Sequence, residues 1–185
     1  MMNKAPWINV INRLAYFIPI YLPEGDGTKI VDVAGNYYHD FRNIRSIRSI
    51  KKFICRHFMV DYQALRQHFQ KRGGSGFAPL ALAPGYTMVA IKTRAARCSG
   101  DPCYGFINVN IIETIEKQEK DGARSRLILR NGCQLPCIST IKTIQNALLM
   151  ARDLEMKGTC RATDATLAEL LLRFLKLYEQ EKNGL

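Results

Sequence analysis

The sequence predicts an α+β protein, with antiparallel sheet segments, among them a meander, and with a basic helix and two C-terminal helices packed on the sheet. Two observations lead to this prediction. Short runs rich in β-branched and aromatic residues alternate with Gly-containing turns, which is typical of antiparallel strands. Three longer runs carry apolar residues at helical spacing. We expect residues 1–158 to form one domain and residues 159–185 to add a helix for packing or dimerisation.

The composition is that of a globular protein. The chain has 185 residues, 47% of them hydrophobic and 23% charged, which suffices for one good core. No apolar run approaches the roughly 20 residues of a membrane-spanning helix, and Pro19 interrupts the short apolar run near the N-terminus. We therefore expect a cytoplasmic protein without a cleaved leader, whose six cysteines are reduced.

The N-terminal part, residues 8–41, is predicted to be mostly β. We expect strands at residues 14–21, 29–33 and 37–41, with a turn at 24–27. A basic helix follows at residues 43–57, and a second helix at 59–70 ends at the glycines of residues 73–76. Two successive helices suggest a helix-turn-helix only weakly, because the join lacks the usual glycine.

The central and C-terminal elements follow from similar signals. Strands at residues 79–83 and 86–92 flank a Pro-Gly turn, and a basic loop spans 93–102. A meander of strands at residues 104–116, 124–129 and 134–138 turns at Asp-Gly and Asn-Gly pairs. Helices at residues 141–157 and 165–181 complete the chain. The first of these has an apolar stripe at Ile141, Ile144, Leu148 and Ala151.

Positive charge is concentrated in residues 41–72. This stretch holds nine Arg or Lys residues and one acidic residue, Asp61, so it supplies +8 of the whole-chain net charge of +11. At helical spacing its cations and its isoleucines fall on opposite stripes. The cationic stripe consists of Arg42, Arg45, Arg48, Lys52 and Arg56, and the apolar stripe of Ile44, Ile47, Ile50 and Ile54.

Most charged helix faces are merely solvated surfaces. Such faces usually mix signs to gain pairing four residues apart, whereas no acid lies between Phe41 and Val60. The repulsion among like charges therefore favours an anionic partner, above all a nucleic acid. The residues that we expect to contact double-stranded DNA are Arg42, Arg45, Arg48, Lys51, Lys52, Arg56, Arg66, Arg94 and Arg97.

Two other kinds of chemistry have weaker signals. Cys98 and Cys103, with Cys133 and Cys137, could form a zinc ribbon, but neither pair has the diagnostic two-residue spacing. A zinc-bearing interaction module is thus the alternative, and small buried thiols are preferred. The three histidines are scattered and no phosphate-binding motif occurs, so we expect neither an enzyme nor a cofactor.

Several strings, taken in order, resemble the competence transcription factor (ComK) family. The run ICRHFMVDY at residues 54–62 corresponds to the family's Cys-containing stretch, although Met59-Val60-Asp61 replaces its Gly-Ser. The later strings that carry the resemblance are Pro79-Leu80, Ile91-Lys92-Thr93, Cys103 with Phe106-Ile107, the run LILRNG at 127–132, Leu135-Pro136, Ser139, Gln145 and Ala147. Phe106 stands where the family has Trp.

The resemblance implies a transcriptional activator of a Gram-positive bacterium. Such proteins bind AT-rich boxes largely from the minor groove and act as paired dimers, so it implies a homodimer or higher oligomer on DNA. It also makes a proteolytic adaptor a candidate partner, although the C-terminal residues carry no obvious equivalent of the stretch that such an adaptor captures. An RNA-binding or membrane-surface protein is a third hypothesis. The sequence gives it neither paired exposed aromatics nor a large apolar face.

Overall fold

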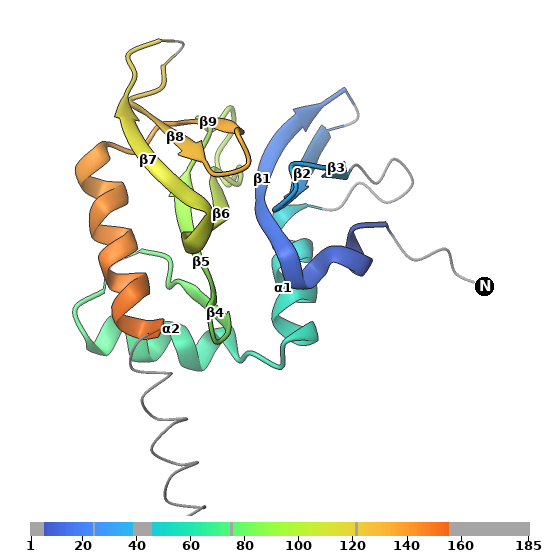
Figure 1. Ribbon diagram of the computed structural model, residues 1–185, viewed down its shortest axis with the longest axis vertical. Helices are drawn as coiled ribbons and strands as arrows, with labels where there is room; N and C mark the ends of the chain where they lie inside the picture. The colour runs from blue at the N-terminus through green and yellow to red at the C-terminus, as the bar shows by residue number, and fades with distance from the viewer. Residues whose placement is uncertain (1–5, 24, 39–45, 75, 121, 156–185) are drawn as a thin grey trace, which may run out of the picture.

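The computed structural model describes residues 6–23, 25–38, 46–74, 76–120 and 122–155, and these residues form an α+β structure with two antiparallel sheets (Figure 1). The predicted fold class is confirmed. The helix expected at residues 165–181, and with it the division of the chain at residue 158, lies outside the described residues. No helix among the described residues is long and apolar enough to cross a membrane.

The larger sheet has six strands in the order β3-β2-β1-β6-β5-β4. Their bounds are β1 Leu14–Leu22, β2 Gly25–Asp32, β3 Tyr37–Tyr38, β4 Leu80–Ala83, β5 Tyr86–Lys92 and β6 Tyr104–Asn108. Pairing of β1 with β6 places Tyr16 opposite Ile107 and so joins the N-terminal strands to the central hairpin. The turn predicted at residues 24–27 is shorter than expected, because β2 already begins at Gly25.

The smaller sheet confirms the predicted meander, with one correction. Its order is β7-β8-β9, with bounds Ile112–Lys117, Ser125–Leu129 and Gln134–Cys137. Residues 104–116 are not one strand, because a 3-10 turn at Val109–Ile111 separates β6 from β7. The Asn108 side chain accepts a hydrogen bond from the Asn110 amide at 3.0 Å, and this local bond ends the strand and redirects the chain into the second sheet.

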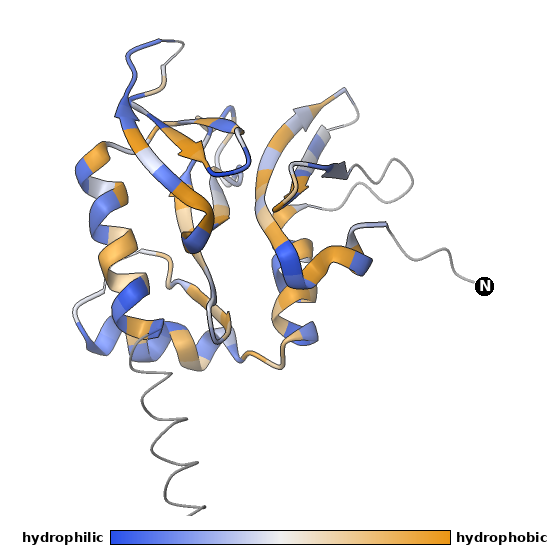
Figure 2. Cartoon of the chain, viewed as in Figure 1, coloured by the Kyte–Doolittle hydropathy of each residue, from blue (hydrophilic) through white to orange (hydrophobic). Residues whose placement is uncertain are grey.

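Helices cover both faces of the six-stranded sheet, whereas the sequence led us to expect them on one. Alternate strand residues enter two separate cores. Phe17 and Phe106 face α1 (Ile47–His57), while Tyr16 and Ile107 face the small sheet and the helix over residues 141–155. Apolar residues accordingly recur along the strands, and apolar and polar bands alternate along α1 and the helix over residues 141–155 (Figure 2).

Other boundaries also differ from the predictions. Residues 8–13, which belong to the stretch expected to be mostly β, instead form part of a 3-10 helix η1 (Pro6–Arg13) that buries Trp7, Val10 and Ile11. The second helix, α2, runs over Tyr62–Lys71 and begins three residues later than predicted. Helix α1 begins at Ile47, and the residues before Ser46 at which it was expected to start lie outside the described part of the chain.

Candidate nucleic-acid interface

Helix α1 is anchored on the six-stranded sheet by its isoleucines. Ile47, Ile50 and Ile54 are all buried, and they share one core with Phe17 of β1 and Phe106 of β6. Spacings of three and four residues keep the isoleucines on one stripe, so the predicted apolar stripe is confirmed for these three residues. Ile44 lies outside the described residues. Because one side of α1 is fixed in this way, its opposite side must face solvent.

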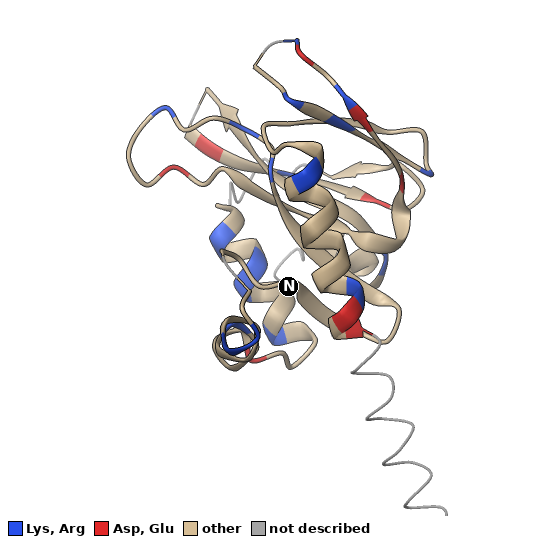
Figure 3. Ribbon diagram, turned by 90° about the vertical axis from the view of Figure 1, so that its left-hand side faces the viewer, with Lys and Arg blue, Asp and Glu red and all other residues tan. Residues whose placement is uncertain are grey.

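That opposite side is a basic face, which consists of Arg48, Lys52 and Arg56. All three side chains are exposed. In the described part of the chain none of them has an acidic group within 4.0 Å, since the four ion pairs found there involve other cations. Lys and Arg recur on α1 and α2 with few acids between them (Figure 3). The basic face is therefore not neutralised from within the described structure.

The turn between α1 and α2 is built without glycine. Met59, an exposed residue, adopts a left-handed φ of 54°, which costs a non-glycine residue about 1–2 kcal/mol. The Val60 amide donates to the Cys55 carbonyl at 2.8 Å, and Asp61 caps α2 by accepting from the amides of Gln63 and Ala64. The turn places α2, with its exposed Arg66, directly after α1.

The loop of residues 93–103, between β5 and β6, is tied to β1 by one carboxylate. Asp101 Oδ2 accepts hydrogen bonds from the Tyr21 hydroxyl at 2.6 Å and from the amides of Arg97 and Cys98 at 2.9 and 3.0 Å. The hydrogen bond from Tyr21, helped by the Cys98 and Arg97 amides, lowers the pKa of Asp101. A charged Asp101 therefore holds the loop in place.

The two arginines of this loop have different surroundings. Arg94 is mostly buried: its Nη2 pairs with Asp26 Oδ1 at 2.5 Å, and its Nε donates to the Pro102 carbonyl at 2.8 Å. Arg97 is exposed. Both guanidinium groups lie against the Tyr21 ring, 3.7 and 3.9 Å from its centroid. Arg94 thus fastens the loop, and Arg97 is the one that is free to face a ligand.

A direct contact joins this loop to the basic face. Arg48 Nη2 donates to the Gly100 carbonyl at 2.9 Å, across 52 residues of sequence. A guanidinium has five N–H donors in a fixed plane, so this bond leaves others for a ligand. The structure therefore brings Arg48 and the loop that carries Arg97 together into one cationic region.

Three further predicted contact residues, Lys51, Arg42 and Arg45, are not part of the basic face as the structure describes it. Lys51 is half-buried, and its Nζ lies 3.8 Å from the centroid of the Tyr62 ring. Burial lowers the pKa of this amine. Lys51 therefore lies beside the basic face rather than on it. Arg42 and Arg45 lie outside the described residues, so their predicted role stays a prediction.

The five cysteines of the described part of the chain are not gathered into a metal site. No group of three or more His, Cys, Asp or Glu side chains suited to a metal ion occurs among the described residues, which include Cys98, Cys103, Cys133 and Cys137. Cys137 is fully buried in the core that faces the small sheet, and burial raises its pKa to about 12. A thiol in that setting packs as a small apolar group.

One feature was missed at the level of sequence. Phe77 and Tyr104 are both partly exposed, and their ring centroids are 4.7 Å apart. The sequence predicts no paired exposed aromatics of the kind that bind RNA, and this pair corrects that prediction. No periodic signal could have found it, because Phe77 lies in the bend before β4 and Tyr104 is the first residue of β6.

Comparisons with protein-family models, with curated proteins and with solved structures find no match for this chain. The resemblance to the competence transcription factor family therefore stays a prediction.

Proposed function

We propose that this protein is a DNA-binding transcriptional activator of the competence transcription factor type, and that α1 and the 93–103 loop grip AT-rich duplex DNA. The observation that carries the proposal is the hydrogen bond from Arg48 to Gly100, because it makes one surface out of two cationic segments. The exposed residues of that surface are Arg48, Lys52, Arg56 and Arg97. Arg66 of α2 is also exposed, and the proposed interface includes it.

Arginine suits this role better than lysine. Its planar fork matches phosphate oxygens, and narrow AT-rich minor grooves have a negative potential that attracts inserted arginine. Phosphate contacts would position the protein, and groove shape with box spacing would supply sequence preference. Box spacing requires at least two copies, so the proposal includes a homodimer or higher oligomer on DNA. The protein would act in the cytoplasm, with a proteolytic adaptor as a further candidate partner.

The test removes the basic face. Arg48, Lys52 and Arg56 are replaced together by Ala, and binding to an AT-rich duplex is measured by gel shift across a salt series. Each phosphate contact contributes a log–log slope of about −0.9, or about fivefold in affinity at 0.15 M salt. We expect affinity to fall about a hundredfold and the slope to become shallower by about 2.7.

A matched control removes the same charge elsewhere. Arg124 and Arg130 are exposed directly before and after β8, and Lys142 is exposed on the helix over 141–155. Their triple replacement by Ala should leave affinity within about fivefold. Circular dichroism confirms that both variants fold. Equal losses of duplex affinity in the two triple variants would show that only net charge matters, and they would contradict the proposed interface. A GC-rich duplex and an RNA duplex in the same assay test the preference for AT-rich DNA.

A further inference from the structure

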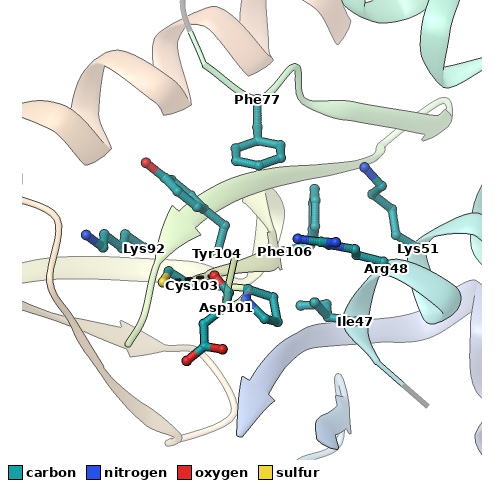
Figure 4. A pocket seen from close by; sticks show the side chains of 10 residues that line it. Ile47, Arg48, Lys51, Phe77, Lys92, Asp101, Cys103, Tyr104 and Phe106 are labelled. Carbon is teal, nitrogen blue, oxygen red and sulfur yellow. Dashed lines mark hydrogen bonds between the residues drawn. The ribbon is translucent and has the colours of Figure 1, made fainter. Parts of the chain in front are cut away.

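A pocket of about 260 Å³ lies between α1, the bend before β4 and the beginning of β6. In Figure 4 Phe77, Tyr104 and Arg48 approach its centre from three different segments. The volume is near the lower limit of small-molecule sites, which is about 300 Å³. One part of the lining is aromatic and another part is cationic.

The aromatic half offers open ring faces. Phe77 is 45% and Tyr104 38% exposed, and the two rings are tilted at 48° to each other. Phe106 is buried and forms part of the same lining. Aromatic rings that remain partly exposed beside a pocket can stack with a flat ring of a ligand. Stacking of a nucleobase on an aromatic side chain is tolerant of base identity, since every base has a π-face.

The cations of the lining are Arg48, Lys51 and Lys92. Figure 4 shows Arg48 and Lys51 together on the side of α1, and Lys92 on the opposite side, beyond Tyr104. The Lys51 amine is partly buried against aromatic rings, and within the described residues it has no acidic partner within 4.0 Å. Asp101 is the one acidic residue of the lining, and its carboxylate already accepts three hydrogen bonds. It points away from the pocket centre in Figure 4. An anionic group of a ligand would satisfy the Lys51 amine.

We propose that this pocket binds a single unstacked nucleotide, with its base against Phe77 and Tyr104 and its phosphate at Lys51 and Arg48. A flat ring joined to an anion matches the two halves of the lining, and exposed aromatics beside cations are the chemistry by which proteins hold unpaired nucleotides. The chemistry is the same for a free nucleotide and for one within a single strand. The proposal stands whether or not the protein binds duplex DNA.

The first experiment is isothermal titration calorimetry of the full chain without duplex DNA. The probes are adenosine 5′-monophosphate, adenosine and ribose 5-phosphate. We expect the intact mononucleotide to bind at least tenfold more tightly than either fragment, because only it engages both halves of the lining. Phe77→Ala should weaken its binding at least fivefold, the lower limit for loss of one stacked base. Lys51→Met should also weaken it, because the variant lacks the charge proposed to face the phosphate.

Two variants outside the pocket serve as controls. Tyr37→Ala removes another exposed ring and Lys142→Met another exposed ammonium, and both should leave mononucleotide affinity within twofold.

Phe77 is partly exposed and uncharged, so its replacement tests stacking while leaving the basic face intact. Duplex affinity is measured on the same samples. If the parent protein binds the mononucleotide but not the duplex, the result counts against the proposed function and not against the pocket.

A single-stranded DNA octamer separates the two sources of the nucleotide. If the octamer binds more tightly than the mononucleotide and Phe77→Ala weakens both, the ligand is a nucleotide within a strand. If the mononucleotide binds at least as tightly, the ligand is free nucleotide. Failure of both probes to bind at millimolar concentration, or binding that Phe77→Ala and Lys51→Met leave unchanged, would overturn the proposal.

Discussion

Two helices pack on opposite faces of the six-stranded sheet, and only one of them has an outer face of a single sign. Helix α1 buries Ile47, Ile50 and Ile54, and the helix over residues 141–155 buries Ile144, Leu148 and Ala151. The inner stripes are equivalent in spacing and in burial. A pattern of burial alone would therefore assign the two helices the same role.

Their outer faces differ in charge. Helix α1 carries Arg48, Lys51, Lys52 and Arg56 with no acid, whereas residues 141–155 carry Lys142, Arg152, Asp153 and Glu155. Asp153 also pairs with Arg72 at 3.8 Å. Mixed signs stabilise a solvated helix, and like signs destabilise it unless a partner compensates. The comparison shows that the apolar stripe decides where a helix packs, while the charge pattern is what distinguishes the two outer faces.

The largest effect should come from the inner stripes, where the two helices are alike. Ile54 and Ile144 are both fully buried. Replacing either one by Ala removes apolar contacts and leaves a cavity, which typically costs about 2–5 kcal/mol of unfolding free energy. Urea denaturation measures the loss. Lys52→Ala, on the exposed face, serves as the control and should change stability by less than about 0.5 kcal/mol. If only one of the two isoleucine variants were destabilised, the helices would not be equivalent in packing.

A smaller effect, on binding alone, should distinguish the outer faces. Arg56→Glu and Arg152→Glu each reverse one exposed charge on one helix. If Arg56 contacts a phosphate, reversal removes an attraction and adds a repulsion of similar size, which corresponds to about thirtyfold in duplex affinity at 0.15 M salt. Arg152→Glu should change affinity by no more than about fivefold. Fluorescence anisotropy with a labelled AT-rich duplex gives both constants, and equal losses would contradict the assignment of the interface to α1.

The smallest effect should be a pH dependence of stability. It comes from Asp101, whose carboxylate attaches the 93–103 loop to Tyr21 of β1. The pKa of Asp101 is lowered in the folded protein, so the unfolded chain binds the proton more readily. The contribution of Asp101 to stability is therefore present above the unfolded pKa of about 3.9 and is lost as pH falls through the lower folded pKa. Asp101→Asn should lack this contribution. Urea denaturation at pH 5 and pH 2.5 should show a smaller acid-induced loss in the variant than in the parent protein.

A useful reference for that measurement is Asp61. Its carboxylate accepts from two amides at the start of α2 and is exposed, but it does not tether the loop. Asp61→Asn retains a good helix cap. If Asp101→Asn lost as much stability between pH 5 and pH 2.5 as the parent protein does, the attachment of the 93–103 loop to Tyr21 would not depend on the charge of Asp101.

The elements with strong local signals were predicted well. The meander was found because Asn-Gly and Asp-Gly pairs fix turns between β-rich runs, and Ile144, Leu148 and Ala151 were found because helical spacing is regular. The break at Val109–Ile111 was missed because the apolar run continues through it, and only the Asn108 side chain ends the strand. The 3-10 helix at Pro6–Arg13 was missed because its buried residues, such as Trp7, have no simple period.

The candidate site was predicted only in part. The exposure of Arg48, Lys52 and Arg56 followed from the isoleucine stripe on the same helix. The burial of Arg94 against Asp26 could not be predicted, since the two residues are 68 positions apart and the sequence at Asp26 indicated a turn. The aromatic pair of Phe77 and Tyr104 likewise depends on contacts between distant segments.

By itself the sequence determined that one helix of this protein has an apolar side and an unneutralised cationic side, because both properties depend on residues within a few turns of each other. Only the tertiary structure decided that Arg48 meets the Gly100 carbonyl and that a pocket opens beside it. The physical reason is the separation along the chain of the residues that decide each property. Helical periodicity is a local property of the chain, whereas the pairing of β1 with β6 and the closure of the 93–103 loop depend on which distant surfaces can be buried together.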